Sequence, residues 1–307
     1  MTIKETLNAA TQKLKANGVE EPRRDAVVLL SFVLNKDKTF LFAHDKDFLE
    51  EETLEKFFSV VERRAAHEPL QYITGKQEFF NLEFEVTKDV LIPRPETEIL
   101  VETALGILDS KFKIQNSKEE IRWSQSAIRN LSVCDVGTGS GCIVVSLLHE
   151  RFFLRGVGLD ISKNALTIAE RNAKRHVVDE RLTLIESDCF SALQNLNTLS
   201  DGRVFVFDLI VSNPPYINEQ DFQTLQSEVK DYEPRQALTP GGDGLSVIRR
   251  LIKDAPRFLK EEGYLIFEIG YDQSNAVKEL VDEKVWTLIE IRKDLQGTRR
   301  TVVLKLV

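Results

Sequence analysis

The sequence predicts an α/β fold in which a mostly parallel seven-stranded sheet, its last strand antiparallel, follows a small N-terminal helical bundle and a β-hairpin linker. Two patterns support this prediction. From residue 93 onward, short apolar runs alternate with helical stretches, which is typical of a parallel sheet covered by helices on both faces. Before residue 76 the apolar residues recur only at helical spacing. We therefore expect a helical domain over 1–75, a hairpin linker over 76–92 and the α/β domain over 93–307.

The N-terminal domain is expected to be a bundle of helices. In "ETLEKFFSVVERRA" the apolar residues follow the i, i+3, i+4, i+7 spacing of one helical face. The stretch "RRDAVVLLSFVLN" is apolar on nearly all sides, which predicts the central helix of the bundle. In "TGKQEFFNLEFEVTKDVLIP" the alternation of Phe80, Leu82, Phe84 and Val86 about a turn near Asn81 indicates a hairpin.

Seven apolar runs are expected to form the sheet: "IRNLSVCDVG", "RGVGLDIS", "LTLIESD", "FDLIVSN", "GYLIFEIG", "KVWTLIEIRK" and "RRTVVLKLV". Only the short segment "DLQGT" separates the last two, so no helical crossover fits between them and the last strand should be antiparallel. A polar segment at 111–129 is expected to be a surface extension.

The composition excludes several classes of protein. A net charge of −8 argues against a protein that coats nucleic acid. No apolar run approaches the ~20 residues that span a bilayer, and the N-terminus lacks the apolar segment of a signal peptide. Cys134, Cys142 and Cys189 are too few and too scattered for a disulfide framework or a metal knuckle, and the histidines show no ligand spacing. We expect a cytoplasmic protein that uses no metal and does not bind membranes.

The first strand of the sheet leads into a glycine-rich loop of Gly137, Thr138, Gly139, Ser140 and Gly141, followed by a helix. Glycines let a ligand approach the backbone, and the helix N-terminus offers free N–H groups. A tight turn without a ligand is the alternative. Cys142 stands where the dinucleotide-binding fingerprint needs a third small residue, and the loop has no Walker lysine. A nucleoside without phosphates therefore fits better than a dinucleotide or a triphosphate.

The next two strands deliver carboxylates to the same edge of the sheet. Asp160 ends the second strand, where it can accept both ribose hydroxyls of a nucleoside. Capping the next helix is the alternative, a task that Ser162 can also perform. Asp188 follows the third strand, where it could bond the exocyclic amine of an adenine. S-adenosylmethionine (AdoMet) is the common nucleoside that matches these features.

The fourth strand stops at Asn213, Pro214, Pro215 and Tyr216. The Asn213 side-chain oxygen and the Pro214 carbonyl can each accept one N–H of a planar amino group, which turns the nitrogen lone pair toward a methyl donor. Tyr216 can stack on a flat substrate group. A proline-stiffened turn is the alternative. Following the two carboxylates, however, the segment favours an amino-group methyltransferase in which catalysis is mainly orientation.

Together these motifs resemble the PrmC/HemK family of release factor glutamine methyltransferases along almost the whole chain. The matching stretches are "EPLQYITGKQEFF", "VLIPRPETE", "CDVGTGSGCI", "DIS", "SNPPYI", "EPRQALTPGGDGL", "EIG" and "KDLQGTRR". The NPPY tetrapeptide alone also suits a DNA adenine or RNA guanine amino-methyltransferase, whereas "PLQYITG" followed by "PRPETE" is much narrower.

The resemblance implies a Rossmann-like, AdoMet-dependent methyltransferase domain preceded by a small helical N-terminal domain. Because the N-terminal helices show no catalytic constellation, we expect that domain to recognise the substrate. The implied substrate is the glutamine side chain in the Gly-Gly-Gln motif of class I peptide chain release factors, whose methylation modulates translation termination. It implies AdoMet contacts from the glycine-rich loop, Asp160, the position of Cys189 and Asn213. It also implies a glutamine site formed by Asn213, Pro214, Pro215 and Tyr216. One departure is Cys189, because relatives often carry an aromatic residue there.

Three alternative functions share some of these residues, but the sequence favours each of them less. A nucleic-acid amino-methyltransferase shares NPPY but should carry a basic face, whereas acidic and basic residues are mixed in the N-terminal region. A nicotinamide oxidoreductase is disfavoured by Cys142 and by NPPY. A non-catalytic AdoMet-binding protein would not need a tetrapeptide that can bind the amide group of a substrate.

Overall fold

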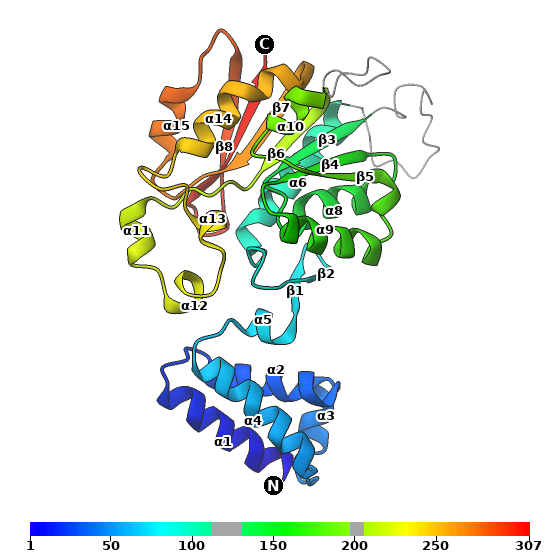
Figure 1. Ribbon diagram of the computed structural model, residues 1–307, viewed down its shortest axis with the longest axis vertical. Coiled ribbons are helices and arrows are strands. Elements are labelled where there is room, and N and C mark those ends of the chain that lie inside the picture. The colour runs from blue at the N-terminus through cyan, green and yellow to red at the C-terminus, as the bar shows by residue number, and fades with distance from the viewer. Residues whose placement is uncertain (112–130, 197–205) are drawn as a thin grey trace. The chain divides into compact units, whose positions relative to one another are not determined.

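The computed structural model describes residues 1–111, 131–196 and 206–307 (Figure 1). The expected surface extension at 111–129 lies, beyond Lys111, outside the described residues. The chain forms two compact units. The helical unit comprises Met1–Lys76 and Leu225–Tyr232, and the sheet unit comprises Gln77–Thr224 and Glu233–Val307.

The helical unit is built from α1 (Ile3–Ala16), α2 (Pro22–Leu34), α3 (Lys38–Ala43), α4 (Glu51–Ala65), α5 (Leu70–Thr74) and α12 (Ser227–Lys230). As expected from its composition, α2 lies in the middle of the bundle and contacts α1, α3, α4 and α5. It buries one face only, however, since Ala26, Leu29 and Leu30 are inaccessible while Phe32 is 44% exposed. Apolar composition on all sides of this helix therefore overstates its burial.

The segment Leu225–Tyr232 follows the NPPY region in sequence yet packs with the helical unit. Arg64, on α4, donates to Asp25 of α2 and to Glu228 of this segment, each over 2.7 Å. The Tyr232 hydroxyl donates to the carbonyl of Ala66 over 2.6 Å. A buried ion-pair network therefore holds a distant part of the chain against α2 and α4.

The hairpin consists of β1 (Lys76–Phe79) and β2 (Leu82–Glu85), which form a two-stranded sheet. Its turn residues Phe80 and Asn81 both have positive φ, 51° and 59°, as in the two-residue turns that match strand twist. Phe84 and Val86 are buried, but before the turn the alternation shifts, so that Phe79 is buried while Phe80 and Leu82 are only half-buried. Both buried phenylalanines belong to a core cluster of the sheet unit.

The main sheet has the strand order β5-β4-β3-β6-β7-β9-β8. Its strands are β3 (Ser132–Val136), β4 (Arg155–Asp160), β5 (Leu182–Glu186), β6 (Phe207–Ser212), β7 (Leu259–Glu268), β8 (Trp286–Lys293) and β9 (Arg299–Leu306). The pairs from β5 to β7 are parallel, and β9 is antiparallel to both β7 and β8. The predicted mostly parallel sheet with an antiparallel last strand is confirmed.

Helices cover both faces of this sheet (Figure 1). On one side are α6 (Glu98–Lys111), α8 (Cys142–Glu150) and α9 (Lys163–Arg175), and on the other α10 (Ser191–Leu196), α14 (Ser246–Asp254) and α15 (Ser274–Leu280). Shorter elements are η1 (Pro95–Thr97), η2 (Asp179–Arg181), α11 (Glu219–Gln223), α13 (Arg235–Leu238) and η3 (Ala255–Phe258).

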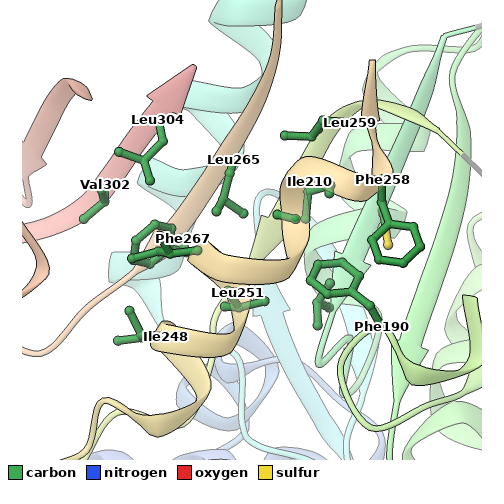
Figure 2. Close-up of a cluster of buried hydrophobic side chains, with 14 of the residues drawn as sticks. Phe190, Ile210, Ile248, Leu251, Phe258, Leu259, Leu265, Phe267, Val302 and Leu304 are labelled. Carbon is green, nitrogen blue, oxygen red and sulfur yellow. The ribbon is translucent and has the colours of Figure 1, made fainter. Parts of the chain in front are cut away.

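Side chains alternate between the two cores, as the pleat of a strand requires. Val302 and Leu304 of β9 point into one core with Phe267 and Leu251 (Figure 2), whereas Val303 points into the other. Phe190 and Phe258 stack in the first core with ring centroids 5.0 Å apart. Because both faces are buried, the strands read as near-continuous apolar runs.

No helix within the described residues is long and apolar enough to cross a bilayer.

Candidate active site

A cavity of about 410 Å³ lies at the carboxyl ends of the parallel strands, and all the residues lining it belong to the sheet unit. Ligands of open parallel sheets bind at this edge. Ten of the residues singled out from the sequence line the cavity: Gly137, Thr138, Gly139, Ser140, Asp160, Asp188, Cys189, Asn213, Pro214 and Pro215. Gly141 and Tyr216 are not among the lining residues.

The glycine-rich loop connects β3 to α8 with a strongly curved backbone. Gly137 and Gly139 have φ of +74° and +55°, and a Cβ on either would meet nothing within 4 Å, so the loop presents bare backbone to open space. Gly141 has φ of +80°, and a Cβ there would lie 3.2 Å from that of Ala169 on α9. The first two glycines therefore leave room beside the loop, whereas Gly141 allows close helix packing.

Two carboxylates, the buried Asp135 and the half-buried Asp160, hold this loop. The Thr138 hydroxyl donates to Asp135 over 2.7 Å, and burial raises the pKa of Asp135 to about 7. Asp160, at the end of β4, accepts hydrogen bonds from the backbone N–H groups of Gly139 (2.8 Å) and Ser162 (2.9 Å). Burial raises the pKa of Asp160, while these two hydrogen bonds oppose the shift. The expected helix cap is Ser162, whose hydroxyl accepts from the Ala165 N–H.

The far side of the cavity is formed after β5. The Asp188 carboxylate accepts a hydrogen bond of 2.8 Å from Arg250 on α14, which also lines the cavity. Cys189, next in sequence, has a positive φ of 50°, and burial raises the pKa of its thiol to about 11. A neutral thiol therefore stands at the position where the family resemblance points to an aromatic side chain in many relatives.

Hydrogen bonds of the Asn213 and Tyr216 side chains anchor the segment after β6. The Asn213 amide Nδ2 donates to Thr97 Oγ1 over 3.0 Å, and the Thr97 hydroxyl donates to Glu268 over 2.7 Å. The Tyr216 hydroxyl donates to the same carboxylate over 2.8 Å, and its ring packs on the hydrophobic core beside β6 and β7. Asn213 thus lines the cavity, while Tyr216 supports it from the core.

A second glycine-rich turn supports the same segment. Gly244 has φ of +78°, and a Cβ there would lie 2.3 Å from the carbonyl oxygen of Tyr216. That carbonyl accepts a hydrogen bond of 2.8 Å from Gln273 Nε2. The "PGGDGL" stretch therefore allows close backbone packing against the NPPY segment.

The loop "PRPETE" also reaches the cavity, since Pro93, Arg94 and Thr97 line it. Arg94 pairs with Glu233, a carboxylate that is only 5% exposed and also accepts from the backbone N–H of Ile92. The ion pair fixes the start of this loop to the start of the segment that leads to α13.

Sequence reasoning gave no individual role to three residues of the site: Thr97, Arg250 and Glu268. Glu268 had a usable signal, because a carboxylate ends the buried run of β7 at the same edge as the other site residues. Thr97 lies in the family motif "PRPETE", but the partners of Thr97 and Arg250 could not be predicted, since each meets its partner only through the packing of distant elements.

Comparisons with known proteins agree on one family. The PrmC N-terminal domain family matches residues 5–75, and a methyltransferase domain family matches residues 128–297. The chain is 38% identical over 303 residues to a release factor glutamine methyltransferase of Koribacter versatilis, covering 99% of this chain and 98% of that protein. A release factor glutamine methyltransferase of Nitratidesulfovibrio vulgaris is also 38% identical, with 98% and 94% of the two chains covered.

Other relatives are longer. A bifunctional methyltransferase of Rickettsia typhi is 37% identical over 98% of this chain, which spans only 57% of that protein. Among solved structures, the hMettl16 catalytic domain in complex with the MAT2A 3′UTR hairpin 6 has a TM-score of 0.53 at 15% identity, covering 80% of this chain and 81% of that one. This structural likeness supports the fold alone.

Proposed function

The chain belongs to the family of release factor glutamine methyltransferases, and from this premise we propose that it transfers a methyl group from AdoMet to the side-chain amide nitrogen of a glutamine. The proposed substrate is the glutamine of the Gly-Gly-Gln motif in class I peptide chain release factors, the class of protein named in the relatives that match over nearly their whole length.

The cavity fits AdoMet in size and in chemistry. Its volume of about 410 Å³ lies within the ~300–1,000 Å³ typical of small-molecule sites. Bare backbone at Gly137 and Gly139 allows close approach of the ligand. Each carboxylate oxygen of Asp160 accepts one hydrogen bond from the protein backbone, so each still has a lone pair that can accept from a ribose hydroxyl. At the other side Asp188 can accept from the adenine amine.

The orientation of Asn213 is the observation that carries the proposal. Its Nδ2 is occupied by Thr97, so its Oδ1 is left to accept an N–H of the substrate amide. The Pro214 carbonyl precedes Pro215, which has no N–H of its own, and can accept the second N–H. Two acceptors on one nitrogen hold both hydrogens away from the methyl donor and direct the lone pair toward it.

AdoMet supplies a methyl group on a sulfonium centre, an electrophile that a neutral nitrogen can attack. The chain's own contribution is then chiefly orientation, for which ~7–11 kcal/mol is the ceiling in intramolecular reactions. Once nitrogen carries the methyl group it is strongly acidic and loses its proton readily. A strong general base is therefore not needed before attack.

The helical unit is proposed to recognise the protein substrate. None of the residues lining the cavity belongs to it. A chain that begins at Lys76 should therefore still bind AdoMet in calorimetry but methylate an intact release factor poorly. Full activity of the shortened chain would contradict this role.

The function is tested by incubating the protein with methyl-labelled AdoMet and a class I release factor, then locating the label by mass spectrometry. The control substrate carries alanine in place of the Gly-Gly-Gln glutamine. We expect label on that glutamine only, and none on the control. Label on DNA or RNA instead of the release factor would contradict the proposal.

Asn213→Ala tests the chemistry at the same site. The variant should fold and bind AdoMet, but turnover should fall by about 10²–10³, as for loss of a contact that stabilises the transition state. Near wild-type turnover by a folded variant would refute the role of Asn213.

Asn213→Asp is a second test, because it keeps an acceptor and adds a negative charge near the sulfonium. That charge stabilises the charged ground state more than the charge-dispersed transition state, so AdoMet should bind at least as well while methylation slows. Unchanged turnover would count against this mechanism.

A further inference from the structure

A buried carboxylate lies behind the Asn213–Tyr216 segment. Glu268 ends β7, the strand next to β6, and is only 2% exposed. Its Oε2 accepts from the Thr97 hydroxyl over 2.7 Å and its Oε1 from the Tyr216 hydroxyl over 2.8 Å. Thr97 in turn contacts Asn213 over 3.0 Å. The contacts form one chain from Tyr216 through Glu268 and Thr97 to Asn213.

With Glu268 ionised, the donor and acceptor roles in this chain of contacts have only one direction. A carboxylate can only accept, so both hydroxyls must donate to Glu268. A hydroxyl has a single hydrogen, and Thr97 has given its own to Glu268. The Thr97 oxygen can therefore only accept from Asn213, and the only donor on that side chain is the amide Nδ2. The amide oxygen must point the other way.

We propose that Glu268, acting through Thr97, is a positioning residue that sets the orientation of the Asn213 amide and so keeps its Oδ1 available to the substrate. A reversed amide would place Asn213 Oδ1 against the Thr97 oxygen, two acceptors with no hydrogen between them. It would also present N–H donors to the substrate N–H groups. The inference rests on the proposed function, because it assigns Oδ1 the task of accepting from the substrate amide.

Two sets of effects act on the ionisation of Glu268. Its pKa lies above the ordinary value because burial, the largest effect, and the charge of Glu96 raise it, while the hydrogen bonds from Thr97 and Tyr216 and the charge of Arg300 lower it. Two hydroxyl donors to one carboxyl group favour its charged form.

The test compares Thr97→Val with Thr97→Ser. Valine removes the hydroxyl while keeping the branched shape, and serine restores the hydroxyl. We expect Thr97→Val to lower kcat by at least roughly tenfold, somewhat less than the loss of a direct contact. Its KM for release factor and its AdoMet dissociation constant by calorimetry should stay within about twofold. Thr97→Ser should keep kcat within about threefold of wild type.

Thr103→Val is the matched control. Thr103 is 3% exposed, against 2% for Thr97, and its hydroxyl contacts the Ile99 carbonyl and Arg292, away from the chain of contacts described above. Its kcat should equal that of wild type.

Glu268→Gln should also allow the Asn213 amide to reverse its orientation. The glutamine amide can donate to Thr97, which frees the threonine hydrogen to turn toward Asn213 and permits the reversed amide. We expect the kcat loss of Thr97→Val, again with unchanged AdoMet affinity. The double variant should lose no more than the larger single effect, because residues that act as a unit are non-additive.

Three results would overturn the proposal: wild-type kcat in folded Thr97→Val or Glu268→Gln, a parallel loss of AdoMet affinity in both, or failure of Thr97→Ser to restore turnover. If the wild-type chain methylates a different acceptor, the proposed function fails. The same variants are then measured on that acceptor, and the proposal about Glu268 stands or falls on the same comparison.

Discussion

The backbone N–H of Gly139, in the loop after β3, donates to the carboxylate of Asp160, the last residue of β4, over 2.8 Å. The second carboxylate oxygen accepts from Ser162 over 2.9 Å. One side chain therefore shapes the glycine-rich loop and also faces the cavity. Its loss should affect the ligand directly and through the loop.

Asp160→Ala should weaken AdoMet binding. A pair of ribose hydroxyls would lose its charged acceptor, which is worth roughly 1.5–3 kcal/mol, and Gly139 would lose its partner. Isothermal calorimetry measures the affinity, and a thermal melt checks that the variant folds. Unchanged affinity in a folded variant would remove Asp160 from the site.

Arg250 should strengthen binding of the adenine by orienting Asp188. Its hydrogen bond to Asp188 orients a carboxylate that lines the cavity. Arg250→Ala should weaken binding of S-adenosylhomocysteine by roughly three- to tenfold, the range of one ordinary hydrogen bond. The neighbouring Arg249→Ala is the control, because Arg249 pairs with Asp243 and neither residue is among those lining the cavity. Equal effects of the two substitutions would contradict the prediction.

The proposed contact between Asp188 and the adenine amine can be tested by changing the base of the ligand. S-inosylhomocysteine carries a carbonyl where the adenine has its amine, so it would set an oxygen against the Asp188 carboxylate. Wild type should prefer the adenosyl compound, and Asp188→Asn should narrow that preference, since its amide can donate to the carbonyl. Competition calorimetry with the two compounds measures the ratio. An unaltered ratio would mean that Asp188 does not contact the base.

Asp135 should make stability depend on pH. Burial raises its pKa from 3.8 to about 7, so the folded state keeps a proton that the unfolded state has released between these values. Its contribution to stability is therefore fully present below pH 3.8 and is lost as pH rises through about 7, with a full span of roughly 4 kcal/mol. Asp135→Asn cannot ionise and should lose less stability over this range. Calorimetric melts at pH 5 and pH 8 should show the variant gaining on wild type at the higher pH, and parallel curves would contradict the prediction.

Arg64 should be a main support of the helical unit. It is buried and paired with Asp25, itself only 5% exposed, and with Glu228. Arg64→Ala leaves a buried carboxylate without its partner, which typically costs about 3–5 kcal/mol. Arg63→Ala is the matched control, because Arg63 pairs with Glu68 nearer the surface and should cost no more than about 1 kcal/mol. Denaturant unfolding of both variants measures the difference, and similar losses would argue against a special role for Arg64.

Local sequence patterns were sufficient for the fold class and for much of the proposed cavity. Apolar runs separated by helical stretches predict parallel strands, and the short "DLQGT" connection predicts the antiparallel end, because no crossover fits there. Since parallel strands share one carboxyl edge, the sequence alone predicts that Gly137, Asp160, Asp188 and Asn213, which stand at or just after strand ends, lie near one another.

Pairings between residues far apart in the chain, in contrast, follow only from the three-dimensional packing. Thr97 meets Glu268 because η1 and α6 pack against the sheet at β7, and Arg64 meets Glu228 because Leu225–Tyr232 packs with the helical unit. Side-chain periodicity records which face of an element is buried, but not which element covers it. The orientation of Asn213 could not be predicted from periodicity, because it depends on the Glu268 carboxylate, placed by strand order, and on the Thr97 hydroxyl, placed by the packing of η1 and α6 on the sheet.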